Sequence, residues 1–169
     1  MRYLVPVARC LLAALFLLSA PSHFKAQTIA YVAQQGVPFA QVLVPLSGLM
    51  ALAGGISVLL GWRARVGAWL LVAFLVAVTP TMHAFWAVPD PMMRMTQFAS
   101  FMKNLGMLGG LLLIAYWGAG PVSLDERAGR SVLEATSVAA ILGGALHSDS
   151  LPRAQASPDL RHDLMRLQP

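Results

Sequence analysis

Four long apolar runs, separated by short polar or proline-containing pieces, dominate the pattern of hydrophobic and polar positions along this chain. They cover residues 4–24, 41–61, 66–88 and 98–118, and each approaches the ~20 apolar residues that a helix needs to cross a bilayer. The second and third runs are joined only by residues 62–65, so the two helices must be antiparallel neighbours. The pattern predicts an all-α integral membrane protein, folded as a four-helix transmembrane bundle.

Two further pieces lie outside these spans. Residues 26–39 mix glutamines with Ile29 and Tyr31 and close at Pro38, which predicts a short helix lying in the outer membrane interface. The alternative for this piece is an ordered loop with an aromatic anchor at the headgroups. After residue 118, Gly120 and Pro121 end the fourth helix. We therefore predict a transmembrane domain over 1–126 and a cytoplasmic tail over 127–169, with a possible short helix over 131–146 and disorder elsewhere.

Composition supports the membrane assignment. The chain is 57% hydrophobic and 11% charged, with a mean hydropathy of +0.66, whereas soluble domains carry about 25% charged residues. The single cysteine, Cys10, lies in the first apolar run, which excludes a disulfide or a cysteine metal site within one chain. The net charge of +5 is spread over loops and tail instead of clustering with aromatic residues, so nucleic acid is not an expected partner.

The basic residues also predict an orientation. Arg63 and Arg65 in the short second link mark that end as cytoplasmic by the positive-inside rule, and Arg2 and Arg127 fall on the same side. Both termini are therefore predicted inside. A cleaved signal peptide is the alternative for residues 4–24, but Pro21 directly follows the candidate cleavage site, and we expect this segment to be retained.

Lys103 and Asn104 interrupt the fourth run, where lipid makes both side chains costly. Lys103 shares a sector of roughly 60° with Gly106 and Gly110, small residues that let helices approach closely. We therefore expect Lys103 to point toward neighbouring helices. Because it lies five residues past Phe98, a rise of ~1.5 Å per residue places it about 7–8 Å inside the outer boundary.

Other nitrogen-bearing side chains are expected at the same depth. His83 precedes the outer end of the third helix by a similar interval, and Pro80 should kink that helix and free a carbonyl nearby. These positions predict a polar pocket near the outer face, and its candidate ligand-binding residues are Lys103, Asn104, His83, Lys25 and His23. The structural alternative is that Lys103 snorkels to the interface and Asn104 bonds a neighbouring carbonyl as a link between helices.

Three other features have simpler interpretations. Arg9 near the inner end of the first helix is expected to snorkel to cytoplasmic phosphates, and Asp90 is read as a solvated turn residue. Thioether and imidazole ligands suit Cu(I), although methionine is also a common filler at interfaces. The methionines near His83 are Met82, Met92, Met93, Met95 and Met102.

Several stretches resemble the DoxX family of small four-helix bacterial membrane proteins. They are "ARCLLAALFLLSAPSHFKAQ", "GWRARVGAWLL", "FMKNLGMLGGLLLIAYWGAG" and "SLDE", together covering roughly residues 5 to 126. Arg9, Lys25, Arg65, His83 and Lys103 match positions that this family fills with the same residue types, whereas Pro21, Ser22 and His23 depart from its pattern. The resemblance implies a multi-pass protein of the bacterial inner membrane, with some relatives that look like subunits of quinone-reducing or oxidative-stress systems.

Together these observations predict a redox-linked inner-membrane subunit with a pocket near the periplasmic side for a quinone-like or small anionic ligand. Lys103 would supply positive charge, and His83 a hydrogen bond or a proton. Since the sequence shows no nucleophile, acid pair or metal cage, either a cofactor, for which a quinone is the candidate, or a redox partner protein would have to carry the electrons. The alternative is a non-catalytic anchor or assembly partner, and Cu(I) binding by the outer loop is weaker. The expected partners are the lipid bilayer, the redox protein and a second copy of the chain.

Overall fold

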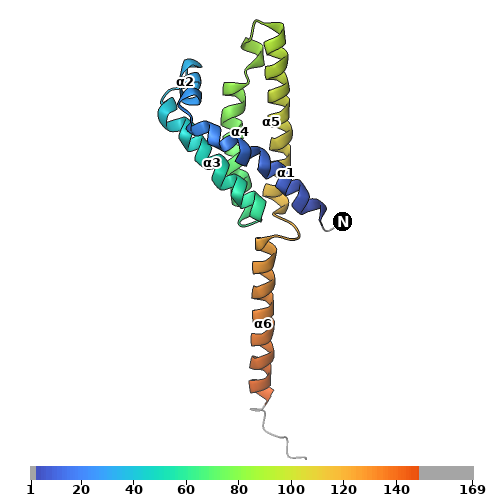
Figure 1. The fold of residues 1–169 in the computed structure, drawn as a ribbon. Coiled ribbons are helices and arrows are strands. Elements are labelled where there is room, and N and C mark those ends of the chain that lie inside the picture. The colour runs from blue at the N-terminus through green and yellow to red at the C-terminus, as the bar shows by residue number, and fades with distance from the viewer. Residues whose placement is uncertain (1–2, 149–169) are drawn as a thin grey trace, which may run out of the picture. The chain divides into compact units, whose positions relative to one another are not determined.

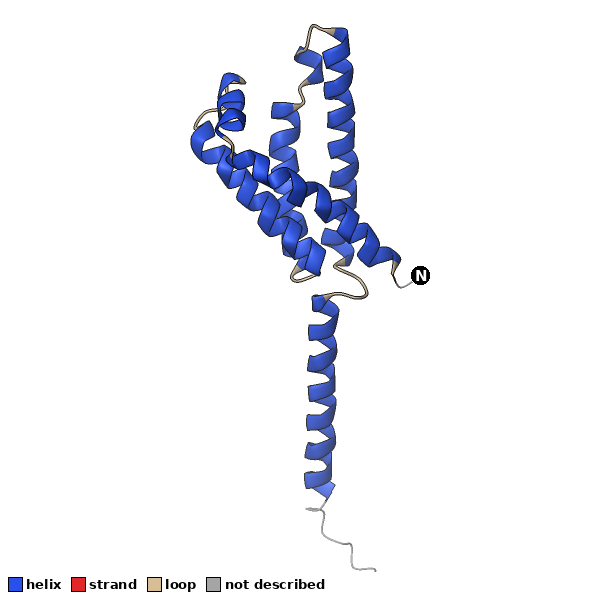
Figure 2. Ribbon diagram, in the orientation of Figure 1, coloured by secondary structure: helices blue, strands red, loops and turns tan. Residues whose placement is uncertain are grey.

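The computed structural model describes residues 3–148, with side chains described as far as residue 139. All regular elements in this part of the chain are helices, and four of them are long and apolar enough to cross a membrane (Figures 1 and 2). The predicted all-α, four-span fold class is confirmed. The elements are α1 (Leu4–Ser19), η1 (Ala20–Phe24), α2 (Ala26–Gln34), α3 (Ala40–Leu60), α4 (Ala64–Met82), η2 (Phe85–Ala87), α5 (Pro91–Trp117) and α6 (Leu124–Ser148).

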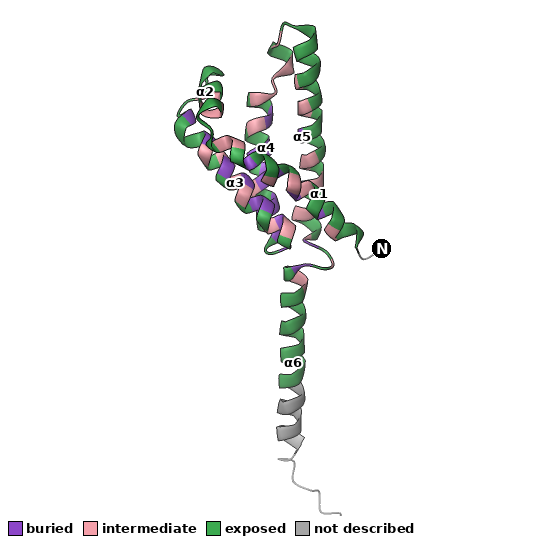
Figure 3. Cartoon of the chain, in the orientation of Figure 1, coloured by how far each residue is buried: buried purple, intermediate pink, exposed green. Residues whose placement is uncertain are grey.

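The chain divides into two compact units, one ending at Arg130 and the other beginning at Ser131. In the first unit, α3 packs against both α1 and α4, and α4 packs in turn against α5 (Figure 1). Buried residues gather where these helices meet, among them Val58, Leu71 and Leu111, while the outward faces carry exposed leucines and valines (Figure 3). Exposed apolar side chains are what a helix facing lipid requires.

Close packing of α3 on α4 depends on glycine. A Cβ atom on Gly54 would lie 2.6 Å from the Cγ atom of Leu71 and 3.0 Å from the carbonyl oxygen of Gly67, so only glycine permits this approach. Gly55 of the same helix meets Leu17 of α1 in the same way. The seam predicted on α5 is wrong at Gly106, because a Cβ atom there would meet open space.

Two helix boundaries differ from the sequence pattern. The third apolar run extends to residue 88, but α4 ends at Met82, two residues after Pro80, whose ring nitrogen cannot donate a helical hydrogen bond. The fourth run was expected to begin at residue 98, but α5 begins at Pro91. The side chain of Asp90 caps α5 by accepting from the backbone N–H of Met93 at 2.7 Å, so Asp90 has a structural role that the turn interpretation missed.

The helix α6 extends over Leu124–Ser148, a longer range than the possible helix over 131–146. The side chains of residues 127–139 are all exposed. The predicted disorder of the tail concerns mainly residues 149–169, which lie outside the described part of the chain.

Candidate functional site

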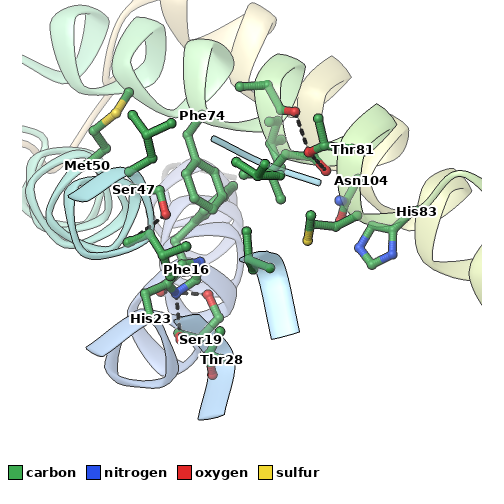
Figure 4. A pocket seen from close by; sticks show the side chains of 18 of the residues that line it. Phe16, Ser19, His23, Thr28, Ser47, Met50, Phe74, Thr81, His83 and Asn104 are labelled. Carbon is green, nitrogen blue, oxygen red and sulfur yellow. Dashed lines mark hydrogen bonds between the residues drawn. The ribbon is translucent and has the colours of Figure 1, made fainter. Parts of the chain in front are cut away.

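A cavity of about 640 Å³ lies in the first unit among α1, α2, α3, α4 and α5 (Figure 4). Its walls are mostly apolar and include Phe16, Met50, Phe74 and Met107. Polar side chains make up the smaller share of the lining. They are Ser19, His23, Thr28, Tyr31, Ser47, Thr81, His83, Gln97, Lys103 and Asn104.

Two hydrogen bonds between α4 and α5 form what we call the polar ladder. In the lower rung, the amide nitrogen Nδ2 of Asn104 donates to the hydroxyl oxygen of Thr79 at 3.1 Å, and both side chains are buried. In the upper rung, the ring nitrogen Nδ1 of His83 lies 2.8 Å from the amide oxygen of Gln97. Asn104 therefore serves as a link between helices, as the structural alternative proposed, and also lines the cavity.

The upper rung determines what His83 can offer. Because the Oε1 atom of Gln97 can only accept, Nδ1 of His83 is the donor in this bond. The other ring nitrogen, Nε2, is then an acceptor in the neutral ring and a donor in the protonated ring. His83 is half-buried at the end of α4 and lines the cavity, so this second nitrogen is the part of the ring left for a ligand.

Lys103 is adjacent to Asn104 in sequence, but its position differs. It lines the cavity with an exposed side chain, and among the residues that the structure describes it has no side-chain hydrogen bond and no ion pair. A helix turns about 100° per residue, so Asn104 can face Thr79 while Lys103 points elsewhere. Its ammonium group is therefore available to an anionic or hydrogen-bond-accepting ligand.

Of the remaining two predicted residues, His23 lines the cavity and Lys25 does not. His23 lines the cavity from η1, with its Nδ1 atom 3.2 Å from the carbonyl oxygen of Ser19 and its ring edge-to-face with Phe74 at 5.7 Å. Lys25 is exposed and is not part of the lining; its backbone carbonyl accepts the first bonds of α2. The structure thus brings Lys103, Asn104, His83 and His23 to one cavity and leaves Lys25 outside it. Ligand binding by these residues stays a prediction.

Sequence reasoning missed Gln97, although a signal existed. Gln97 and Asn104 are seven residues apart, and Thr79 and His83 are four apart, so each pair shares one helix face. Of the methionines considered for Cu(I), Met82 lines the cavity, while Met92 and Met95 are exposed on the first turns of α5. Copper binding stays a prediction.

At the opposite end of the first unit, an arginine of α1 connects this helix to the loop after α5. Arg9 is only 3% exposed, and its guanidinium donates from Nη1 to the carbonyl of Ala119 at 2.6 Å and from Nη2 to the carbonyl of Val122 at 3.0 Å. The expectation that Arg9 snorkels to phosphates is therefore wrong. A Cβ atom on Gly61 would lie 2.8 Å from Nη1, so the turn after α3 needs glycine to admit this side chain.

Asp125, at the start of α6, also contacts this end of the first unit. Its carboxylate oxygens accept from the backbone N–H groups of Arg63 at 2.7 Å and Ala64 at 3.0 Å, which caps the start of α4. Its own N–H donates to the carbonyl of Gly61 at 2.8 Å. We call Arg9, Gly61 and Asp125 with these contacts the basal clamp.

Comparison with known proteins gives a family and several curated relatives. A model of the SURF4 family matches residues 3–130. The chain is 32% identical to the inner membrane protein YqjF of Escherichia coli strain K12 over 124 residues, which is 72% of this chain and 89% of that protein. It is 27% identical to the inner membrane protein YphA of the same organism over 100 residues, 59% of this chain and 71% of that one.

The chain is also similar, over a shorter range, to a eukaryotic protein. The chain is 34% identical to a Surfeit locus protein 4 homolog of Drosophila melanogaster over 73 residues, 42% of this chain, and it spans only 27% of that protein's length. No solved structure matches. The assignment to the DoxX family is wrong, because the matching family model and the named relatives are different ones. The stretches behind it consist mainly of small and apolar residues, which packed transmembrane helices need in any family.

Proposed function

We propose that this multi-pass inner-membrane protein, which belongs to the SURF4 family, binds an amphipathic, quinone-like ligand in the cavity among α1 to α5. The observation that carries the proposal is the division of the cavity wall. Most of the lining is apolar, while Lys103 from the middle of α5 and His83 from the end of α4 offer hydrogen-bonding atoms. A ligand with an apolar body and an oxygen-bearing head fits that division.

Size and charge support the same ligand class. A cavity of about 640 Å³ lies within the range of small-molecule sites, roughly 300–1,000 Å³. The ionisable side chains of the described lining are Tyr31, Lys103 and two histidines, and no carboxylate is among them. Such a lining favours oxygen acceptors and anions over cations. A quinone carbonyl could accept from the Lys103 ammonium, and its ring and tail could lie against Phe74, Met50 and Met107.

The redox-linked role is part of this proposal. When bound, a quinone would supply the redox chemistry, with electrons from a partner protein. The residues of this chain would bind and orient it: Lys103 by charge, and Nε2 of His83 by exchanging a proton or a hydrogen bond. Gln97 would fix the His83 ring so that Nε2 keeps one direction.

The direct test is a binding titration. A short-chain benzoquinone is titrated into the detergent-purified protein, with the shift in unfolding temperature as the readout. Hydrogen bonds from a charged donor contribute ~1.5–3 kcal/mol, so Lys103→Met should weaken binding roughly tenfold to a hundredfold. His83→Phe should weaken it less, because the ring keeps its apolar contacts.

Lys25→Met is the matched control, because Lys25 is an exposed lysine near the same end of the unit but outside the cavity lining. It should bind the quinone as the unchanged protein does. Equal affinity of Lys103→Met, His83→Phe and the unchanged protein would refute the proposal. Equal weakening by Lys25→Met would show that charge alone is responsible.

A non-catalytic role in membrane assembly is the second candidate, and α6 favours it. Its described side chains are exposed and include Val132, Leu133 and Val138, at 56–68% exposure. Truncation after Arg130 should then leave quinone binding unchanged and reduce the self-association of the purified chain, measured by its mass in detergent. Loss of quinone binding in the truncated chain would contradict this separation of roles.

A further inference from the structure

A second hollow, of about 730 Å³, lies at the predicted cytoplasmic ends of α4 and α5. It shares no lining residue with the ligand cavity. Its lining combines two arginines, a tryptophan and two acids with the loop that follows α5. The residues are Arg63, Arg65, Val66, Trp117, Gly118, Ala119, Gly120, Pro121, Ser123, Asp125 and Glu126.

Both acids are already engaged by other groups. Each carboxylate oxygen of Asp125 accepts a backbone N–H at the start of α4. In Glu126, Oε2 accepts from the N–H of Val122 at 2.7 Å, and Oε1 accepts from the guanidinium of Arg130. Among the described residues, neither carboxylate forms an ion pair with the two arginines that line the hollow. Because Arg130 compensates Glu126, the two arginines and Asp125 leave the lining with a net positive charge.

The arginines keep donor groups open. Arg65 is exposed and, among the described residues, has no side-chain hydrogen bond or ion pair; its Nε atom lies 3.4 Å from where a Cβ atom would be on Gly118. The guanidinium of Arg63 lies over the ring of Trp62, 5.8 Å from its centroid. Stacking uses the face of the guanidinium and leaves its N–H edge free.

Exposed aromatic side chains place the hollow at a membrane surface. Trp62 is 57% exposed at the end of α3, and Trp117 and Tyr116 are 74% and 73% exposed at the end of α5. Amphipathic rings gather at the level of the lipid headgroups. By this rule the guanidinium groups of Arg63 and Arg65 should lie at the level of the lipid phosphates.

We propose that this hollow binds the phosphate of an anionic phospholipid headgroup, with Arg63 and Arg65 donating to its oxygens and Trp117 contacting the glycerol region. Guanidinium groups match phosphate oxygens in pairs, which favours this chemistry over a neutral or zwitterionic headgroup. The acyl chains of the lipid would follow the exposed apolar face of α4, beginning at Val66. This site does not depend on the quinone proposal.

The test compares lipids added to the detergent-purified full chain, with native mass spectrometry and the unfolding temperature as readouts. Phosphatidylglycerol should bind and stabilise the protein, and phosphatidylcholine should do so much less. Each arginine near an anionic surface contributes about 1 kcal/mol to the free energy of binding. Replacing both, in the variant Arg63→Gln with Arg65→Gln, should therefore weaken phosphatidylglycerol binding roughly 30-fold. Asp125, which shapes the loop, is unchanged in this variant.

Lys25→Gln with Arg94→Gln removes the same charge from residues outside the hollow and should retain binding. Inorganic phosphate without lipid forms the second arm. Stabilisation by free phosphate as large as that by phosphatidylglycerol would overturn the lipid assignment in favour of a soluble anion. Equal binding of the two phospholipids, or unchanged affinity in the double arginine variant, would overturn the site itself.

Discussion

Replacing Arg9 by methionine tests whether the basal clamp stabilises the bundle. Arg9 is 3% exposed and donates to carbonyls more than a hundred residues away in the chain, at Ala119 and Val122. Methionine has a similar length and fills the same apolar space, but it cannot donate. The substitution therefore removes both hydrogen bonds while leaving little cavity.

The expected loss can be estimated from these contacts. Each carbonyl deprived of a charged donor costs ~1.5–3 kcal/mol when it stays buried. Ala119 is 4% exposed, so its carbonyl should bear the full cost, whereas Val122 is 37% exposed and water can replace its donor. Burial of the guanidinium itself, whose Nε atom lacks a partner among the described residues, offsets part of the loss. The net destabilisation should be about 2–4 kcal/mol.

The assay is thermal unfolding of the purified protein in one detergent. At ~2–4 °C per kcal/mol for a chain of this size, Arg9→Met should lower the unfolding temperature by roughly 5–15 °C. Arg9→Lys keeps one donor and should lie between this variant and the unchanged protein. Cys10→Ser, at the exposed neighbouring position, is the control and should melt normally. If Arg9→Met melted with the control, Arg9 would not be a stabilising contact.

Substitutions at four further residues test other contacts, by thermal unfolding or, for Gln97, by quinone binding. Asp125→Ala should cost about 1–2 kcal/mol by uncapping α4, and Asp125→Asn should cost less, an order that a purely surface role would not produce. Gly54→Val should cost more than ~2 kcal/mol, because its Cβ atom would lie 2.6 Å from Leu71; full stability would rule out close packing there. Asn104→Leu should destabilise the protein by about 1 kcal/mol, because the hydrogen bond to Thr79 is lost. Gln97→Leu should mainly weaken quinone binding, because His83 loses the partner that orients its ring. A loss of stability in Gln97→Leu with a loss of quinone binding alone in Asn104→Leu would contradict these roles.

The four spans could be predicted because the requirement behind them is physical and local: about 20 consecutive apolar residues must cover the hydrocarbon core. The start of α5 was missed although Asp90 and Pro91 form a recognisable N-terminal cap. Hydrophobicity alone placed the start of α5 at residue 98, seven residues after its actual start. The end of α4 was missed because an apolar run continues past Met82, and hydrophobicity does not distinguish α4 from the short helix η2.

Residue counting along the helices predicted that Lys103, His83 and His23 would lie near one another, and all three line one cavity. The depth of Lys103 was nevertheless counted from residue 98, whereas α5 begins at Pro91 and places Lys103 near the middle of the helix. Rotation of one helix about another does not follow from counting. Arg9 shows the limit most clearly, because its partners lie at sequence separations of 110 and 113 residues and leave no local pattern.

The two ends of the first unit differ in what holds them. At the end with the basal clamp, charged side chains bridge α1, the α3–α4 turn and the loop before α6. Toward the other end, the described polar side-chain bonds between α4 and α5 are the two rungs of the ladder, and each such bond contributes only about 1 kcal/mol. Breaking the two bonds of the ladder should thus cost less than breaking the bonds of the clamp. A ligand that favours a wider outer cavity would have to supply, through its higher affinity for that form, at least the free energy of the two ladder bonds.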